Sequence, residues 1–218
     1  MIWSPGRNYL FIHIPKTGGT SLALALEGRA MKEDVMLGDT PKALKRRRRV
    51  ANLKTSGRLW KHSALSDLEG LVPNEDLETL FVFTLVRNPW DRMVSYYHWL
   101  RGQEFDHPAV RLAKTVPFKP FVLDPMTRAT WRKSPARSYV CDREGQDRCR
   151  SYIRIEHLKE DAQPLWAHLG FTLEVPHVNL SDRDAQYGRY FDQETQAAVA
   201  EIAAEDISQF GYTFEGES

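Results

Sequence analysis

The sequence predicts a three-layer α/β fold in which helices flank a central, mainly parallel sheet. Three observations predict it. Residues 80–86 (Leu-Phe-Val-Phe-Thr-Leu-Val) are apolar without alternation, which is typical of a strand covered on both faces. A second apolar run lies at residues 9–14, and each run is followed closely by a segment with helical spacing of apolar residues. Strands that alternate with helices in this way build parallel sheets.

The first half of the chain supplies two strand-to-helix junctions. The strand at residues 9–14 is followed by a proline, and residues 21–28 carry leucines among alanines, as expected of a helix. After the strand at residues 80–86, Asn88 is a good N-cap for a helix over residues 89–100, whose first residue is a proline. Open α/β sheets bind ligands where their strands end, so both junctions are candidate sites.

The second half of the chain is less regular. Prolines and charges interrupt the spacing over residues 101–137, which favours short helices or an irregular insertion over a new domain. Two strands, at residues 139–141 and 149–155, are expected to form a hairpin, and residues 156–169 are expected to form a helix. The last helix is expected over residues 192–211, with an aspartate as its N-cap and a glycine at its end.

Length and composition favour a single domain over residues 1–218. A chain of this size with 42% hydrophobic residues can form one substantial core. Its formal net charge of +1 argues against a basic field over the whole molecule for nucleic acid or a membrane surface, so any anion site is local. No apolar stretch is long enough to span a bilayer, and the first ten residues do not resemble a signal peptide. We therefore expect a cytoplasmic protein without a membrane span.

The two cysteines allow two interpretations. Cys141 and Cys149 flank a polar stretch, so they are either free thiols or a disulfide across the expected hairpin. No Cys or His spacing is typical of zinc, and we expect no metal site.

The junction after the first strand has the composition of a phosphate-binding loop. It reads His13-Ile-Pro-Lys-Thr-Gly-Gly-Thr-Ser-Leu22. The glycines let the backbone approach an anion closely, the helix N-terminus presents unpaired N–H groups, and Lys16 adds a positive charge. Helix capping and a turn would explain the glycines and hydroxyls without a ligand, but not the lysine. The predicted anion-binding residues are Lys16, Thr17, Gly18, Gly19, Thr20 and Ser21.

A nucleoside triphosphatase loop is the nearest alternative for this junction. Its pattern G-x-x-x-x-G-K-[ST] is absent, since Lys16 precedes the glycines. The strand at residues 80–86 also ends in Arg87-Asn88 and not in the aspartate that holds Mg²⁺ in such enzymes. Protein cations and backbone dipoles are therefore expected to bind the anion alone.

The junction after the second strand carries a second candidate, Arg87-Asn-Pro-Trp-Asp-Arg-Met-Val-Ser-Tyr-Tyr97. Arg87 stands at the strand end, and Ser95 follows two helical turns later, about 10 Å along the axis. A guanidinium and a helix-borne hydroxyl suit a phosphate monoester that lies beside the helix. The alternative is that Arg87 pairs with a nearby carboxylate and Ser95 faces a neighbouring element.

Together these two elements resemble the nucleotide-binding elements of PAPS-dependent sulfotransferases, especially the bacterial and Golgi carbohydrate sulfotransferases. Residues 13–21 look like the family's 5′-phosphosulfate loop, and residues 86–96 look like its 3′-phosphate element. A looser resemblance continues through residues 61–64, 154–158 and 178–183. It implies a P-loop-like fold, 3′-phosphoadenosine-5′-phosphosulfate (PAPS) as donor, 3′,5′-adenosine bisphosphate (PAP) as product, and a carbohydrate as acceptor.

The resemblance also implies roles for individual residues. Lys16 would stabilise the charge that grows on the leaving phosphate oxygen, and Arg87 and Ser95 would hold the 3′-phosphate. His62 lies where the carbohydrate sulfotransferases carry a base histidine, and His13 is its rival. A late loop that closes over the nucleotide would contribute Ser181 and Arg183.

Two other functions stay open on the sequence alone. A nucleotide-dependent kinase would need ATP, Mg²⁺ and carboxylates that the motifs do not place. A non-catalytic polyanion-binding protein would use the basic run 45–49, although that run lacks the interleaved aromatic residues that favour nucleic acid. Three tryptophans are candidates for stacking on sugar rings, with burial in the core as the alternative: Trp60, Trp99 and Trp131.

Overall fold

The computed structural model describes residues 1–176, 183–184 and 186–214. The chain divides into two compact units. The sheet unit comprises Met1–Val86 and Ala136–Asn179, and the helical unit comprises Arg87–Pro135 and Leu180–Ser218. The expectation of one domain over residues 1–218 stays a prediction.

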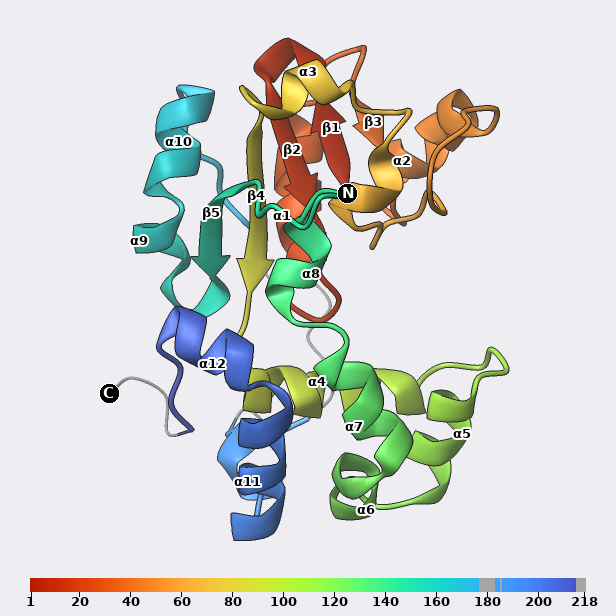
Figure 1. The fold of residues 1–218 in the computed structure, drawn as a ribbon, viewed down its shortest axis with the longest axis vertical. Helices are drawn as coiled ribbons and strands as arrows, with labels where there is room; N and C mark the ends of the chain where they lie inside the picture. Colours follow the sequence, from red (N-terminus) through yellow and green to blue (C-terminus); the bar gives the residue numbers. More distant parts are fainter. Residues whose placement is uncertain (177–182, 185, 215–218) are drawn as a thin grey trace. The chain divides into compact units, whose positions relative to one another are not determined.

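The sheet unit is built on five strands in the order β3-β1-β2-β4-β5 (Figure 1). Strand β4 pairs in parallel with β2 and with β5, whereas β1 is antiparallel to both β2 and β3. The parallel centre confirms the predicted fold class, and the antiparallel edge adds two short strands that the sequence did not indicate. The strands are β1 (Ile2–Ser4), β2 (Tyr9–Ile12), β3 (Val35–Met36), β4 (Phe81–Val86) and β5 (Cys149–Arg154).

Helices cover both faces of this sheet, because alternate side chains of β2 and β4 point to opposite cores. On one face Leu10 and Val82 pack with Leu68 and Val140. On the other, Phe11 and Phe83 pack with apolar residues of α1 and α10, which completes three layers. The helices of this unit are α1 (Gly19–Gly28), α2 (Pro41–Arg46), α3 (Asn74–Leu77), α8 (Ala136–Val140), α9 (Leu158–Asp161) and α10 (Gln163–Leu169), with 3-10 turns at Pro5–Arg7, Arg47–Val50, Leu65–Leu68 and Ile155–His157.

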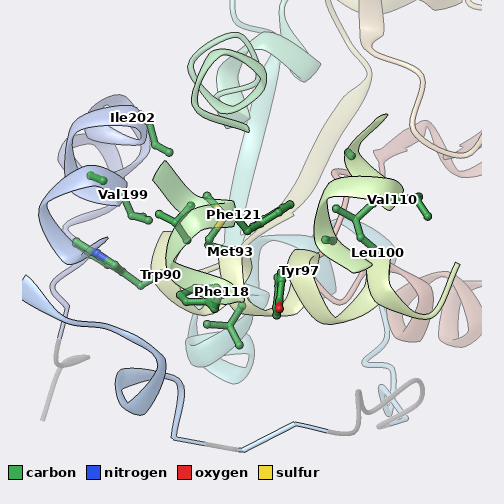
Figure 2. Close-up of a cluster of buried hydrophobic side chains, with 14 residues drawn as sticks. Trp90, Met93, Tyr97, Leu100, Val110, Phe118, Phe121, Val199 and Ile202 are labelled. Atoms are coloured by element: carbon green, nitrogen blue, oxygen red, sulfur yellow. The ribbon is translucent and has the colours of Figure 1, made fainter. Parts of the chain in front are cut away.

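The helical unit surrounds one aromatic core. Trp90, Met93 and Tyr97 of its first helix, α4, are buried against Phe118, Phe121, Val199 and other apolar side chains (Figure 2). The interrupted stretch at residues 101–137 does form short helices, as predicted. The helices are α4 (Pro89–Arg101), α5 (Pro108–Thr115), α6 (Phe118–Leu123), α7 (Pro125–Arg132), α11 (Gln193–Ile202) and α12 (Ala204–Phe210), with a 3-10 turn at Tyr187–Tyr190.

The predicted hairpin is wrong, although its second strand, expected at residues 149–155, is confirmed as β5. Residue 139 lies in α8, and only an isolated bridge joins Cys141 to Asp147, while β5 pairs with β4 instead. Backbone bonds close the connection, and the Asp142 side chain adds two more, since it accepts from the Gln146 amide at 2.8 Å and from Arg148 Nε at 2.6 Å. Both cysteines are free thiols.

Two predicted helices are each divided. The helix expected over residues 156–169 begins as a 3-10 turn and breaks at Ala162, just before a proline in the first turn of α10. The last helix breaks at Ala203, but its N-cap and its end are confirmed. The Asp192 side chain accepts from the Thr195 amide, and Gly211 ends the helix with φ 69°. No helix in the described ranges combines the length and the hydropathy needed to cross a bilayer.

Candidate functional site

The loop between β2 and α1 has an unusual backbone. Lys16 has φ 67° and Gly18 has φ 82°, both in the left-handed region. The buried hydroxyl of Thr17 donates to the carbonyl of Ile14 at 2.9 Å, which fixes the turn. Gly18 is the N-cap of α1, and no described side chain caps this helix. Its first N–H groups are therefore directed into the loop, where an anion can accept from them.

Steric contacts require glycine at two positions of this loop. A methyl group added at Gly18 would collide with the Ile155 side chain, and one added at Gly19 would collide with the His13 ring. The loop thus needs both glycines whether or not a ligand binds. The lysine is different, because a lysine in the left-handed region costs about 1–2 kcal/mol that glycine would not. Such strain points to a function for Lys16.

Replacing Gly19 by alanine should therefore destabilise the protein. The His13 ring is 7% exposed and stacks on Phe11 at 5.8 Å, so it cannot move aside easily. We expect a loss of about 1–3 kcal/mol in the free energy of unfolding, measured with urea. Gly28 is a matched control at the other end of α1, with no atom within 4 Å of an added methyl. Gly28→Ala should be neutral or slightly stabilising, and equal effects at both positions would mean that the His13 contact does not restrict position 19.

Two histidines lie beside this loop. Nδ1 of His62 is 2.7 Å from the carbonyl oxygen of His13, and the ring centroids are 4.6 Å apart. A carbonyl oxygen only accepts, so Nδ1 of His62 carries the proton and Nε2 carries the lone pair. Burial lowers the pKa of His62 to about 4, and it also lowers the pKa of His13 well below its ordinary value. Both rings are neutral near pH 7, and His62 presents a proton acceptor at Nε2.

A rigid turn holds His62 in place. Ser63 is completely buried. Its hydroxyl accepts from the Trp60 amide at 2.9 Å and donates to the Arg58 carbonyl, which is also 2.9 Å away. On the other side the Lys61 carbonyl accepts from the Met1 amino group at 2.7 Å. These bonds fix residues 58–63 before any ligand binds, as a catalytic group requires.

A small hollow opens beside the loop and this turn. It is lined by His13 and Thr20 from the loop region, and by Asp39, Thr40 and Lys61. Asp39 and Lys61 form an ion pair there. A larger pocket of the sheet unit lies over Leu68, Val72 and neighbouring charged side chains and contains no predicted site residue.

The second candidate element lies in the helical unit and is organised by a carboxylate. Nε and a terminal nitrogen of Arg87 lie 2.7 and 2.6 Å from one oxygen of Asp91, and Arg183 lies 2.6 Å from the other oxygen. The alternative raised from the sequence, that Arg87 pairs with a carboxylate, is what the structure shows. Asp91 thus brings two guanidinium groups together, and guanidinium groups are the donors that bind phosphate in a fork geometry.

Ser95 continues this row along α4. Asp91 and Ser95 are four residues apart in α4, which places them on one side of the helix, and Arg87, just before the N-cap Asn88, reaches Asp91. Ser95 is 5% exposed. The sequence prediction left the partner of Arg87 unnamed, although spacing of four residues between opposite charges is a recognisable signal for Asp91. Ser181 lies outside the described residues.

The predicted residues thus form two groups. Lys16 to Ser21 and His62 lie together in the sheet unit, whereas Arg87, Ser95 and Arg183 lie together in the helical unit. In the part of the chain that the structure describes, no three His, Cys, Asp or Glu side chains are gathered as a metal site.

Comparisons with known proteins give one family. A family model described as "Sulfotransferase family" matches residues 1–213. No curated protein matches the sequence. Among solved structures, the crystal structure of mouse sulfotransferase SULT7A1 complexed with PAP is similar, with 16% identity and a TM-score of 0.49 over 94% of this chain and 86% of that chain. The family match covers nearly the whole sequence, whereas the structural likeness is distant.

Proposed function

Since the chain belongs to the sulfotransferase family, we propose that it moves the sulfuryl group of PAPS to a hydroxyl of a carbohydrate and releases PAP. The observation that carries the proposal is the state of His62. Its Nδ1 is held on the His13 carbonyl and burial lowers its pKa to about 4, so a neutral ring with an accepting Nε2 lies beside the glycine loop. A base next to an anion site is what transfer to a hydroxyl requires.

Each group of residues is assigned one phosphate of the donor. The loop at residues 15–21 resembles the family's 5′-phosphosulfate loop and combines Lys16 with the uncapped start of α1. Arg87 follows directly after β4, which is the parallel neighbour of β2, so both elements start from the same edge of the sheet. A dianionic 3′-phosphate is a partner that guanidinium groups bind through strong charge-assisted hydrogen bonds.

The transfer is in line and needs no metal in this proposal. The acceptor oxygen attacks sulfur as the bond from sulfur to the phosphate oxygen breaks, and the hydroxyl proton passes to Nε2 of His62. The bridging oxygen leaves with PAP, and Lys16 stabilises the negative charge that grows on it. Arg87, Arg183 and Ser95 fix the donor in register without taking part in the chemistry.

Calorimetric titration of the purified protein tests this proposal. PAP should bind without a metal and more tightly than ATP with Mg²⁺ under the same conditions. A preference for Mg-ATP would instead support the kinase alternative. Binding of long polyanions with a steep salt dependence, and no binding of PAP, would support a polyanion-binding protein.

Arg87→Ala should weaken PAP binding by about 10- to 100-fold, because charge-assisted hydrogen bonds contribute roughly 1.5–3 kcal/mol. AMP, which lacks the 3′-phosphate, is the matched ligand. Its affinity should be nearly the same for the wild type and the variant. An equal loss for both ligands would mean that Arg87 acts on the fold of the site and not on the 3′-phosphate.

A further inference from the structure

Of the three candidate tryptophans for sugar stacking, the structure leaves one exposed. Trp99 and Trp131 are partly buried and pack against the aromatic core of the helical unit. Trp60 has 44% of its surface exposed and belongs to the sheet unit. A single exposed ring is ordinary on a protein surface, so the groups around Trp60 decide whether it has a binding role.

Trp60 contacts the proposed base. Its ring lies edge-to-face with that of His62, with centroids 5.1 Å apart at an angle of 85°. The guanidinium carbon of Arg58 lies 5.8 Å from the Trp60 ring centroid. The buried Ser63 hydroxyl bonds to the backbone of residues 58 and 60. The side chains of Arg58, Trp60 and His62 therefore extend from one fixed turn.

The surrounding segment is strongly basic although the whole chain is nearly neutral. Residues 40–66 contain no Asp or Glu, and their positive residues are Lys42, Lys45, Arg46, Arg47, Arg48, Arg49, Lys54, Arg58 and Lys61. Some of these are used within the fold: Lys42 binds the carbonyl of Glu27, and Arg46 binds the carbonyls of residues 31 and 34. Lys45, Lys54 and Arg58 are exposed. Lys61 pairs with Asp39, and Asp67 accepts from the Ala64 amide, so the exposed cation beside the Trp60 ring is Arg58.

We propose that Trp60 and Arg58 form the acceptor subsite and select an acidic sugar. A pyranose ring stacks on the indole, its carboxylate or sulfate pairs with Arg58, and a neighbouring hydroxyl is thereby directed toward Nε2 of His62. This inference rests on the proposed sulfotransferase function. Trp60 and Arg58 are positioning residues, because neither one takes up the proton or touches the sulfuryl group.

The test measures oligosaccharide binding to the protein saturated with PAP. The probes are a hyaluronan hexasaccharide and tetragalacturonate, which are acidic, and cellohexaose, which is neutral. The wild type should bind the acidic probes more tightly. Trp60→Ala should weaken all binding by about tenfold or more, and Trp60→Phe should restore a large part of it. Arg58→Gln should weaken acidic probes only.

Two control variants separate this subsite from a diffuse basic surface and from nonspecific contact with any exposed ring. Lys54→Gln removes an exposed cation of the same segment, and Phe105→Ala removes an exposed aromatic ring of the helical unit. Both should affect binding much less than the subsite variants. With a probe that the enzyme sulfates, Trp60→Ala should raise the KM for that probe more than it lowers kcat. The affinity for PAP and the urea concentration at the unfolding midpoint should stay unchanged.

Failure of this inference is distinguishable from failure of the proposed function. A wild type that does not bind PAP refutes the donor assignment itself. A wild type that binds PAP but none of the acidic probes overturns the subsite alone. Equal losses for Lys54→Gln and Arg58→Gln would also overturn it, because they would indicate a diffuse basic field.

Discussion

Replacing Lys16 by methionine is expected to lower kcat by about 10²- to 10³-fold, the usual loss when one preorganised stabiliser of a developing negative charge is removed. The bridging oxygen gains charge only as the bond to sulfur breaks, so PAP affinity should fall far less than kcat. Single-turnover transfer from PAPS and calorimetry with PAP measure the two effects. Lys32→Met is the matched control, since Lys32 is an exposed lysine of the same unit.

Lys16→Gly makes this test sharper. Lysine is strained at φ 67°, whereas glycine adopts that conformation freely. The glycine variant should therefore equal or exceed the wild type in unfolding free energy and still lose the rate. Opposite changes in stability and activity would identify Lys16 as a residue retained for chemistry. A variant that loses stability and keeps its rate would refute the assigned role.

The parallel centre of the sheet was predictable because a strand buried on both faces is apolar along its whole length, and such a run can be recognised in the sequence. The unbroken apolar run at residues 80–86 corresponds to β4, which the structure begins one residue later, at Phe81. The edge was not predictable, since β1 and β3 have only three and two residues. Strands so short show no periodicity, and their pairing depends on contacts made across the sheet.

The hairpin prediction failed because its first strand is the end of a helix. Residues 139 and 140 belong to α8, although backbone bonds between Asp142 and residues 145 and 146 do form a turn. The competing pairing with β4 buries Ile153 completely. Local propensity could not show that this second partner was available.

The same limit applies to the candidate site. Residue type and place at a strand end predicted roles for Lys16 and Arg87, and these roles stay predictions. The contact between His62 and the His13 carbonyl joins residues 49 positions apart, and the Arg183 pairing with Asp91 is also distant in sequence. Local patterns do not encode such contacts, so which nitrogen of His62 accepts a proton became clear only from the fold.

His62→Gln is expected to lower kcat by about 10²- to 10⁴-fold, because it removes the general base. The wild-type rate should be independent of this group from neutral pH down to about pH 5. It should then fall as pH drops through about 4, where the folded-state ring takes up a proton at Nε2. The rate of the His62→Gln variant should not show this decrease at acidic pH, which is the acidic limb of the pH profile. A His62→Gln variant that keeps the limb would assign the base to another group, with His13 the first candidate.

The free energy of unfolding should also depend on the titration of His62, and it should decrease as the pH falls. Unfolding raises the pKa of His62 from about 4 to its ordinary value of 6.5, so the unfolded chain binds the proton first as pH falls. The neutral ring therefore contributes stability above pH 6.5 that is lost progressively between 6.5 and about 4. Urea unfolding across this window should show a smaller loss for His62→Gln than for the wild type. An unchanged loss would mean that burial does not hold the His62 ring neutral, and His62 would then lose its assignment as a neutral base.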